Sequence, residues 1–304
     1  MRKRLLLSYG AALGSAALVG FFTVLNKWIM VENVPALTAG AWTYFAAGVS
    51  LLPGAIRAGG FHLKRPIVVA LWLLAGSVVG PSLYFAGLSL TSGVQGVLLI
   101  NTEAVFTALL AFILFRERLT WNTVLASIAI VAGGIWLSWP ESGSGLPDGN
   151  VLGNLLIAMG YLGWATENNL GRLLGDDIPA VTLVSLKALA AGLVMGILAV
   201  VYGQSLSVPW RVVPGIVASG AFSLGLSLAL FYWAMKGIGA GRAGLISSTS
   251  TFWGVVAALV LLGESLTPRT ICGGLLMVGG LALFAVESLH QLPGPGDQTG
   301  SSCG

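Results

Sequence analysis

The sequence predicts an all-α integral membrane protein, with ten transmembrane helices arranged as two inverted five-helix repeats and both termini in the cytoplasm. Three observations support this fold class: an apolar composition, ten long apolar segments, and a second half that repeats the first. Hydrophobic residues make up 56% of the 304 residues and charged residues only 9%, whereas about 25% of the residues of a soluble domain are charged. A water-soluble fold of this size is therefore excluded, and the lipid bilayer is the expected solvent.

Proline, glycine and charged residues divide the chain into ten apolar segments, each near the roughly 20 residues that a helix needs to cross a bilayer. In order, the expected helices span residues 5–30, 35–57, 66–90, 92–115, 119–139, 151–174, 178–202, 209–235, 240–262 and 268–289. The first follows a basic N-terminus, but its apolar run is too long for a signal peptide. We expect residues 1–139 to form the first repeat, 140–150 a Gly/Ser-rich connection, 151–289 the second repeat and 290–304 a flexible tail.

Lysine and arginine gather in the loops on one side of these helices. With a cytoplasmic N-terminus, Arg211 and Arg269 fall outside, and the basic residues that fall inside are Arg2, Lys3, Arg4, Arg57, Lys64, Arg65, Arg116, Arg118, Arg172, Lys236 and Arg242. Short cytoplasmic loops carry the excess of Lys and Arg in membrane proteins. The formal charge of +4 is therefore a signal of topology, and no nucleic-acid partner is expected.

The second half of the chain repeats the first. Val34-Pro35-Ala36-Leu37-Thr38 returns as Ile178-Pro179-Ala180-Val181-Thr182, and further matches follow in the same order at similar offsets. They include Gly20 with Gly163, Thr23 with Thr166, Asn26 with Asn169, and Tyr84 with Tyr232. Because five is an odd number of helices, the second unit enters the membrane from the opposite side. Inverted repeats are frequent in secondary transporters, which bind substrate near the midplane and work by alternating access.

Two further repeated motifs carry a family resemblance. Arg116-Glu117-Arg118-Leu119-Thr120 and Gly263-Glu264-Ser265-Leu266-Thr267 each precede an apolar helix with paired glycines, at Gly133-Gly134 and Gly279-Gly280. With these motifs, residues 5–289 resemble the drug/metabolite transporter superfamily in its ten-helix class with two EamA-type halves. In overall pattern the chain is most similar to bacterial aromatic amino-acid exporters. Many members carry a proline in the fourth and ninth helices, where this chain has Asn101-Thr102-Glu103 and Ser250-Thr251-Phe252.

Glu103 is the first candidate for a substrate contact. It lies near the centre of the fourth expected helix, where an ionised carboxylate costs roughly 2.5–3.5 kcal/mol, so it should face a cavity or a partner. It is predicted to hold a substrate ammonium or to relay a proton. The alternative is a protonated glutamate that joins two helices by a hydrogen bond. The repeat also brings Asn101 and Ser250 near the midplane, and both are predicted substrate contacts.

The sixth expected helix supplies further candidates. Tyr161, Trp164 and Asn168 share one face and are predicted to line a cavity for an aromatic or amphipathic substrate; packed aromatic residues are the alternative. Glu167 lies about 10 Å and Lys187 about 13 Å from the cytoplasmic ends of consecutive helices, at 1.5 Å per residue. We expect these two to form a structural ion pair, since either charge alone would be costly.

The remaining candidates come from other helices. Tyr84 and the serine stripe that includes Ser223 and Ser227 are predicted substrate contacts, although serine stripes also join helices. Glu117 and Glu264 lie at helix ends near Arg116, Arg118 and Arg269. They are predicted to form structural or gating salt bridges.

The sequence thus predicts a secondary transporter that exports small metabolites by alternating access at a midplane cavity. The resemblance implies export and a preference for aromatic or large apolar amino acids. The alternative is a proton-coupled multidrug exporter, in which Glu103 binds lipophilic cations and protons in turn. No H-E-x-x-H zinc motif and no phosphate-binding loop occur, so no enzyme activity, metal or cofactor is expected. The expected location is the bacterial inner (plasma) membrane, and the expected partners are a small-molecule substrate and the bilayer.

Overall fold

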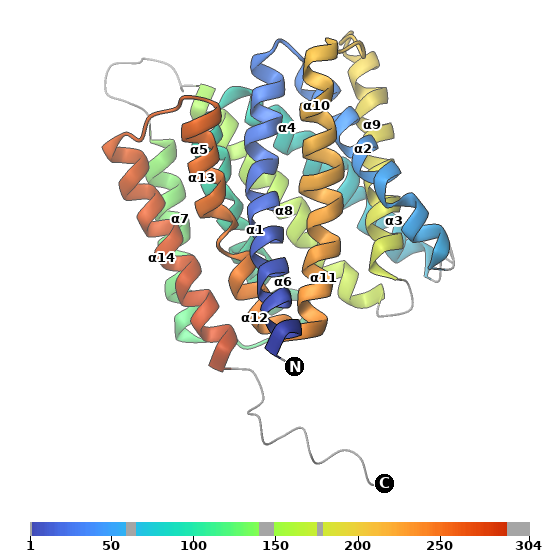
Figure 1. The fold of residues 1–304 in the computed structure, drawn as a ribbon. Coiled ribbons are helices and arrows are strands. Elements are labelled where there is room, and N and C mark those ends of the chain that lie inside the picture. Colours follow the sequence, from blue (N-terminus) through green and yellow to red (C-terminus); the bar gives the residue numbers. More distant parts are fainter. Residues whose placement is uncertain (1, 59–64, 140–148, 175–178, 291–304) are drawn as a thin grey trace.

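The structure is a computed structural model, and it describes residues 2–58, 65–139, 149–174 and 179–290. Within these ranges the chain is a bundle of helices without strands (Figure 1). Ten helical rods run along the bundle, and each rod end lies within three residues of the end expected from the sequence. The predicted fold class is confirmed. Most of the expected connection at 140–150, and all but the first residue of the expected tail at 290–304, lie outside the described residues.

Each rod consists of one helix or of shorter helices in line. The rods of the first half are α1 (Arg2–Val31), α2 (Ala36–Arg57), α3–η1–α4 (Pro66–Leu73, Leu74–Val79, Gly80–Leu90), α5–η2–α6 (Gly93–Leu98, Leu99–Asn101, Thr102–Phe115) and α7 (Trp121–Ser138). Those of the second half are α8 (Gly149–Leu174), α9 (Ala180–Val201), η4–α10–η5–α11 (Trp210–Val212, Val213–Val217, Ala218–Leu226, Ser227–Ile238), α12–α13 (Ala240–Ser247, Ser250–Leu261) and α14 (Pro268–His290).

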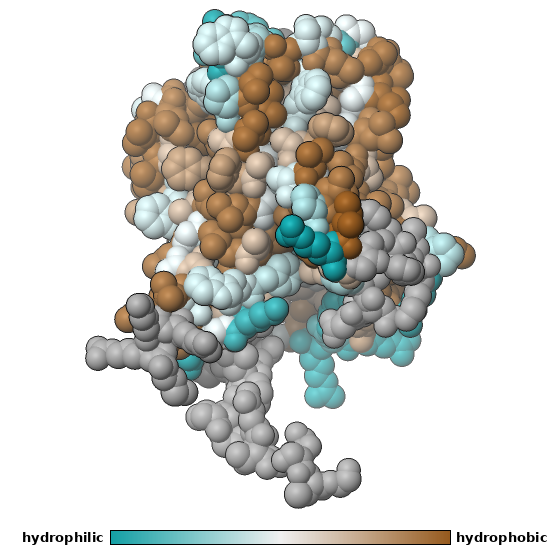
Figure 2. Space-filling model, turned by 45° about the vertical axis from the view of Figure 1, so that its right-hand side comes forward, coloured by the Kyte–Doolittle hydropathy of each residue, from teal (hydrophilic) through white to brown (hydrophobic). Residues whose placement is uncertain are grey.

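The rods are long and apolar enough to cross a membrane in most cases. Eight of them meet this measure by length and composition, and α14 contributes a shorter apolar stretch, Pro268–Phe284. The exception is α8, which carries Asn154, Glu167, Asn168 and Asn169 within its length. Three of these four side chains are buried against neighbouring helices, as expected of polar groups inside a bilayer. Figure 2 shows hydrophobic residues over much of the surface that lipid would cover.

The helix contacts of the two halves correspond to each other. The second rods of the two halves, α2 and α9, pack together, and so do the fifth rods, α7 and α14. The first rod of each half packs against the third rod of the other, since α1 lies along η5–α11 and α8 lies along α4. Such reciprocal pairs are what a two-fold relation between two five-helix units produces.

The halves also share their irregularities. The third rod of each half contains a π-helical segment, η1 in the first and η5 in the second. The fourth rods are broken as well, at the 3₁₀ turn η2 and at residues 248–249 between α12 and α13. π-Helical segments are rare in proteins, and those that do occur are often found at functional sites. Both lie next to the cavity described below.

Glycines allow the closest helix contacts. A Cβ atom at Gly133 of α7 would lie 2.7 Å from the Gly273 carbonyl oxygen of α14, and one at Gly280 would lie 2.7 Å from the Ala126 carbonyl oxygen. A side chain at either position would force the two helices apart, so small residues determine this interface. The pair α7 and α14 lies at one edge of the bundle (Figure 1).

The two ends of the bundle differ in charge. The start of α1 and the end of α14 lie at the same end (Figure 1), which we call the inner end; the opposite one is the outer end. The basic residues at inner helix ends and loops include Arg57, Arg65, Arg116, Arg118, Arg172, Lys236 and Arg242, whereas Arg211 and Arg269 lie at the outer end. From the distribution of Lys and Arg, we expect the inner end to face the cytoplasm.

Candidate functional site

A cavity of about 300 Å³ lies in the interior of the bundle, between the two halves. Its wall comes from α1, α2 and η2–α6 of the first half and from α8, α9 and η5–α11 of the second. The predicted substrate contacts that line it are Glu103, Tyr161, Trp164, Asn168, Ser223 and Ser227. Its volume is at the lower end of the roughly 300–1,000 Å³ of small-molecule sites, so it suits a small metabolite.

Two larger hollows lie on the sides of the bundle, where the helices would face lipid. One, of about 640 Å³, lies along α13 and α14, and the other, of about 690 Å³, lies between α2 and α9. Both are lined mainly by apolar side chains such as Phe252, Leu275 and Leu193. Lipid chains would fill such surfaces in a bilayer. We therefore place the candidate site in the smaller interior cavity, where the polar groups converge.

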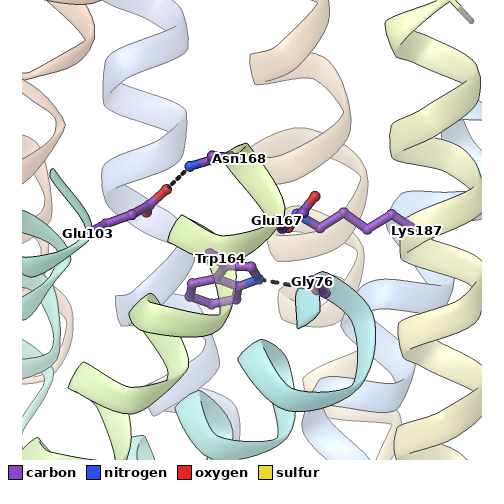
Figure 3. Close-up of polar contacts among 6 residues, drawn as sticks. All are labelled: Gly76, Glu103, Trp164, Glu167, Asn168 and Lys187. Atoms are coloured by element: carbon purple, nitrogen blue, oxygen red, sulfur yellow. Dashed lines mark hydrogen bonds and ion pairs between the residues drawn. The ribbon is translucent and has the colours of Figure 1, made fainter. Parts of the chain in front are cut away.

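Glu103 faces this cavity from the first turn of α6. Its Oε1 atom accepts a 2.7 Å hydrogen bond from Asn168 Nδ2 of α8 (Figure 3). This contact joins the two halves across the cavity wall. A carboxylate can accept several hydrogen bonds, so Glu103 has capacity left for a ligand.

Glu167, the residue before Asn168 on α8, forms an ion pair with Lys187. Lys187 Nζ of α9 lies 2.6 Å from Glu167 Oε2, and both residues line the cavity. In Figure 3, Glu103 and Lys187 reach α8 from different sides. They contact the consecutive residues Asn168 and Glu167, respectively. Gly76 of η1 lies behind the Glu167 carboxylate, and a Cβ atom there would overlap it. The glycine therefore allows the π-helical segment to pack on the ion pair.

Aromatic rings form the outer side of the cavity. Trp164 lies with its ring centre 5.1 Å from that of Tyr161 and 5.2 Å from that of Tyr84. Its Nε1 atom donates a 3.3 Å hydrogen bond to the Gly76 carbonyl oxygen (Figure 3). Phe22 of α1 stacks on Tyr84, with ring centres 5.9 Å apart. The indole is thus held by both a hydrogen bond and ring contacts, which gives the cavity a rigid aromatic wall.

The cavity is closed toward the outer end. One turn outward of its lining, Asn26 donates a 2.7 Å hydrogen bond to Ser219 and accepts one of 2.8 Å from Thr43, and all three side chains are buried. On the inner side Asn168 is exposed and Glu103 is partly exposed. The burial pattern therefore indicates a cavity that opens toward the inner end.

Two cavity serines differ in their hydrogen bonds. Ser227 Oγ donates to the Ser223 carbonyl oxygen, at 2.5 Å, and so bonds within its own rod. Ser223 Oγ is buried and has no hydrogen-bond partner among the described residues. An unpaired buried hydroxyl costs free energy, so Ser223 is the serine with capacity for a ligand.

Three predicted substrate contacts do not line the cavity. Tyr84 lies behind Trp164, fully buried, and donates a 2.7 Å hydrogen bond to Thr23 Oγ1. Asn101 donates to the Leu98 carbonyl oxygen and accepts from Thr251, at 2.9 and 3.2 Å, so it holds the fourth and ninth rods together. Ser250 is buried where α13 meets Gly20 of α1. The repeat suggested these residues as substrate contacts, but it does not indicate which neighbours their side chains meet.

The structure shows partners of the helix-end glutamates that the sequence did not suggest. Glu117 pairs with Arg172 of α8 at 2.6 Å, and the Arg172 guanidinium lies 4.8 Å from the centre of the Phe115 ring. Glu264 accepts the backbone N–H groups of Gly93 and Val94 at 2.6 and 2.8 Å. Glu117 therefore joins two rods at the inner end, whereas Glu264 caps the start of α5 at the outer end.

Sequence reasoning missed two parts of the site. Phe22, Thr23 and Tyr44 also line the cavity, and only the repeat match of Thr23 with Thr166 gave a signal for them. No signal in the sequence indicated that the backbone of Gly76 contributes to the site. The charged residues are also not repeated: the partners of Glu103, Glu167 and Lys187 in the other half are Thr251, Val24 and Thr43.

Comparison with known proteins gives one family and several relatives. The model of the EamA-like transporter family matches residues 6–139 and again residues 151–286. An uncharacterized transporter of Methanothermobacter thermautotrophicus is 26% identical over 298 residues, covering 92% of this chain and 87% of that protein. The uncharacterized transporter YetK of Bacillus subtilis is 25% identical over 295 residues, with the same shares covered.

Two further comparisons extend these. A probable terminal-alkyne amino-acid exporter of Streptantibioticus cattleyicolor is 25% identical over 294 residues, covering 87% of this chain and 94% of that protein. One solved crystal structure matches with a TM-score of 0.61 at 20% identity, covering 91% of this chain and 98% of the matched chain. At that identity the match shows a shared fold alone.

Proposed function

Because this chain belongs to the EamA-like transporter family, we propose that it is a secondary transporter that exports amino acids with aromatic or large apolar side chains. The observation that carries the proposal is the composition of the cavity. A carboxylate with free acceptor capacity, Glu103, lies there beside an aromatic wall built around Trp164. This combination suits an ammonium group joined to an apolar side chain, and both halves of the bundle contribute to it.

In this proposal each part of the cavity meets one part of the substrate. Glu103 binds the ammonium group, while Asn168 holds the carboxylate of Glu103 in place. Tyr161 and Trp164 pack against the apolar side chain. Asn101, which the sequence suggested for the same task, serves instead to join two helices. Rocking of the halves about the cavity would open it to each side in turn.

The direction and location have separate support. One relative is named as a probable amino-acid exporter, and relatives occur in bacteria and archaea. The cavity opens toward the inner end, which is where an exporter loads its substrate. The proposed location is therefore the bacterial inner membrane, with substrate taken from the cytoplasm.

One observation favours a second candidate function. Glu103 and Glu167 bring two negative charges to the cavity and Lys187 one positive charge, so an ionised cavity has a net charge of −1. A negative cavity with aromatic walls also suits a lipophilic cation, because cations bind over aromatic rings. Proton-coupled export of such cations is therefore the alternative, with Glu103 as the proton carrier.

Flux into liposomes that contain only this protein separates the two functions. We expect saturable uptake of labelled phenylalanine in the absence of a pH gradient, and little uptake of tetraphenylphosphonium. Cation uptake that requires a pH gradient would instead support the multidrug function. Absence of flux for both would contradict both proposals.

The matched variants are Glu103→Gln and Glu32→Gln, which make the same chemical change at two places. Glu103 faces the cavity, whereas Glu32 pairs with Arg211 at the outer end, at 2.9 Å. Loss of a hydrogen bond to a charged group costs about 1.5–3 kcal/mol, so Glu103→Gln should raise the KM for phenylalanine about 10- to 100-fold. Equal KM values for the two variants would remove Glu103 from the substrate site.

A further inference from the structure

The Glu167–Lys187 ion pair lies on the wall of the cavity, where a ligand can reach it. Lys187 Nζ and Glu167 Oε2 are 2.6 Å apart, and the side chains are 21% and 6% exposed. Both belong to the lining of the cavity that also contains Glu103. A lysine ammonium has three N–H donors, and Glu167 is the partner that the structure gives Lys187. The pair therefore has donors to spare on its more exposed side.

The side chains of Glu167 and Lys187 differ in conformational freedom. Glu167 is fixed, because its carboxylate packs against Gly76 so closely that a Cβ atom there would overlap it. Lys187 has a long, flexible side chain of four carbons and a compact charge, and it is the more exposed partner. If the pair opens, Lys187 is the residue that moves.

Charge balance decides which ligand can open the pair. An ion that bound only one partner would leave the other charge buried and unpaired, which is strongly unfavourable. A zwitterion binds both, since its carboxylate takes Lys187 and its ammonium takes Glu167. Four charges of alternating sign then replace two, and no charge is left alone. Glu103, the ammonium site of the proposed function, lines the same cavity as this pair, so the two carboxylates can share the ammonium.

We propose that a zwitterionic amino acid inserts into the Glu167–Lys187 ion pair, and that Lys187 is the residue that binds the substrate carboxylate. This inference rests on the proposed function, and it adds the group that distinguishes an amino acid from an amine. Ser223 Oγ, buried on the same cavity wall without a partner, is a further donor for the carboxylate. The pair is thus part of the substrate site as well as a link between α8 and α9.

The test is competition against labelled phenylalanine on the purified full-length protein. Two competitors each lack one charge: 2-phenylethylamine has no carboxylate and 3-phenylpropionate has no ammonium. For the unmodified protein we expect phenylalanine to bind at least about tenfold more tightly than either, since one charge-assisted hydrogen bond contributes that much.

The decisive variant replaces both partners, as Glu167→Gln with Lys187→Met, so that no single charge remains buried. Its affinity for phenylalanine should fall about 10- to 100-fold, and its discrimination against 2-phenylethylamine should disappear, since Glu103 still binds the ammonium. The matched control is Glu32→Gln with Arg211→Met, which removes the ion pair at the outer end. That control should keep both the affinity and the discrimination.

The outcomes separate this inference from the function on which it rests. If the cavity double variant folds and still discriminates, the pair is only structural and the inference is overturned. If that variant does not fold, Lys187→Arg replaces it, because it keeps the pair and moves the positive charge. Unchanged discrimination and affinity in Lys187→Arg would also overturn the inference. If the unmodified protein does not bind phenylalanine, the proposed function fails, and the inference fails with it.

Discussion

At the scale of single residues, the site depends on one position that has no side chain. The Gly76 carbonyl oxygen accepts the Trp164 indole N–H, and the space beside its Cα atom is taken by the Glu167 carboxylate. The aromatic wall and the ion pair therefore both rest on the same residue of η1. Neither function can be read from glycine in a chain that contains 43 of them.

Replacing Gly76 by alanine should disturb the site and the fold together. The added Cβ atom would overlap Glu167, and overpacking of this kind costs about 1–3 kcal/mol. We expect a lower melting temperature in detergent and weaker phenylalanine binding. Gly10→Ala is the matched control, because a Cβ atom there meets nothing within 4 Å, and its melting temperature should not fall. A Gly76→Ala protein as stable as the control would show that η1 can shift to accommodate the added Cβ atom without loss of stability.

At the scale of helices, the rods divide into those that form the cavity and those that do not. The fifth rods, α7 and α14, pack on each other through Gly133 and Gly280 and contribute no residue to the cavity lining. The third rods carry the π-helical segments beside the cavity. Stability and binding should therefore be separable by mutation.

Gly133→Ala tests this separation. Its Cβ atom would lie 2.6 Å from Met277 Cγ and 2.7 Å from the Gly273 carbonyl oxygen, so we expect destabilisation of about 1–3 kcal/mol with an unchanged Kd for phenylalanine. Gly279→Ala in α14 is the control, since nothing lies within 4 Å of its Cβ position. A large change in Kd for Gly133→Ala would mean that the α7–α14 interface is coupled to the cavity.

The sequence predicted helices better than it predicted the direction of side chains. All ten rods could be placed because apolar length, proline and charge are local signals. Helical spacing predicted that Tyr161, Trp164 and Asn168 share one face of their helix, and all three line the cavity. By contrast, the partner of Glu117 was predicted among its chain neighbours but is Arg172, 55 residues away. Asn101 and Tyr84 were suggested by the repeat, yet rotation about the helix axis and packing decide what each one meets.

At the scale of the whole molecule, the two ends of the bundle differ in their number of basic residues. Most of the described basic residues lie at the inner end, whereas Arg211, Arg269 and Lys27 lie at or near the outer end. From this distribution and the even number of rods, we expect both the start of α1 and the end of α14 to lie on the cytoplasmic side.

Cysteine labelling in intact cells tests this orientation. In a background with Cys272→Ala and Cys303→Ser, a cysteine at Ser207 in the outer connection between α9 and η4 should react with a membrane-impermeant maleimide. A cysteine at Ala58, which follows α2 at the inner end, should react only after the cells are opened. The reverse pattern would invert the orientation and turn the proposed export into import.

The unequal charges of the two halves have a consequence for the transport cycle. The repeat positions that correspond to Glu103, Glu167 and Lys187 in the other half are the uncharged residues Thr251, Val24 and Thr43. The helix arrangement is therefore nearly two-fold symmetric, but the distribution of charge is not. In the proposed alternating-access cycle, the inward-facing and outward-facing states would then not be mirror images, and they would bind the same substrate with different affinity. A passive carrier of this kind has unequal half-saturation constants on its two faces, although the concentration gradient alone sets the direction of net flow. Comparing influx with efflux in right-side-out vesicles would reveal that asymmetry as a kinetic property of the carrier.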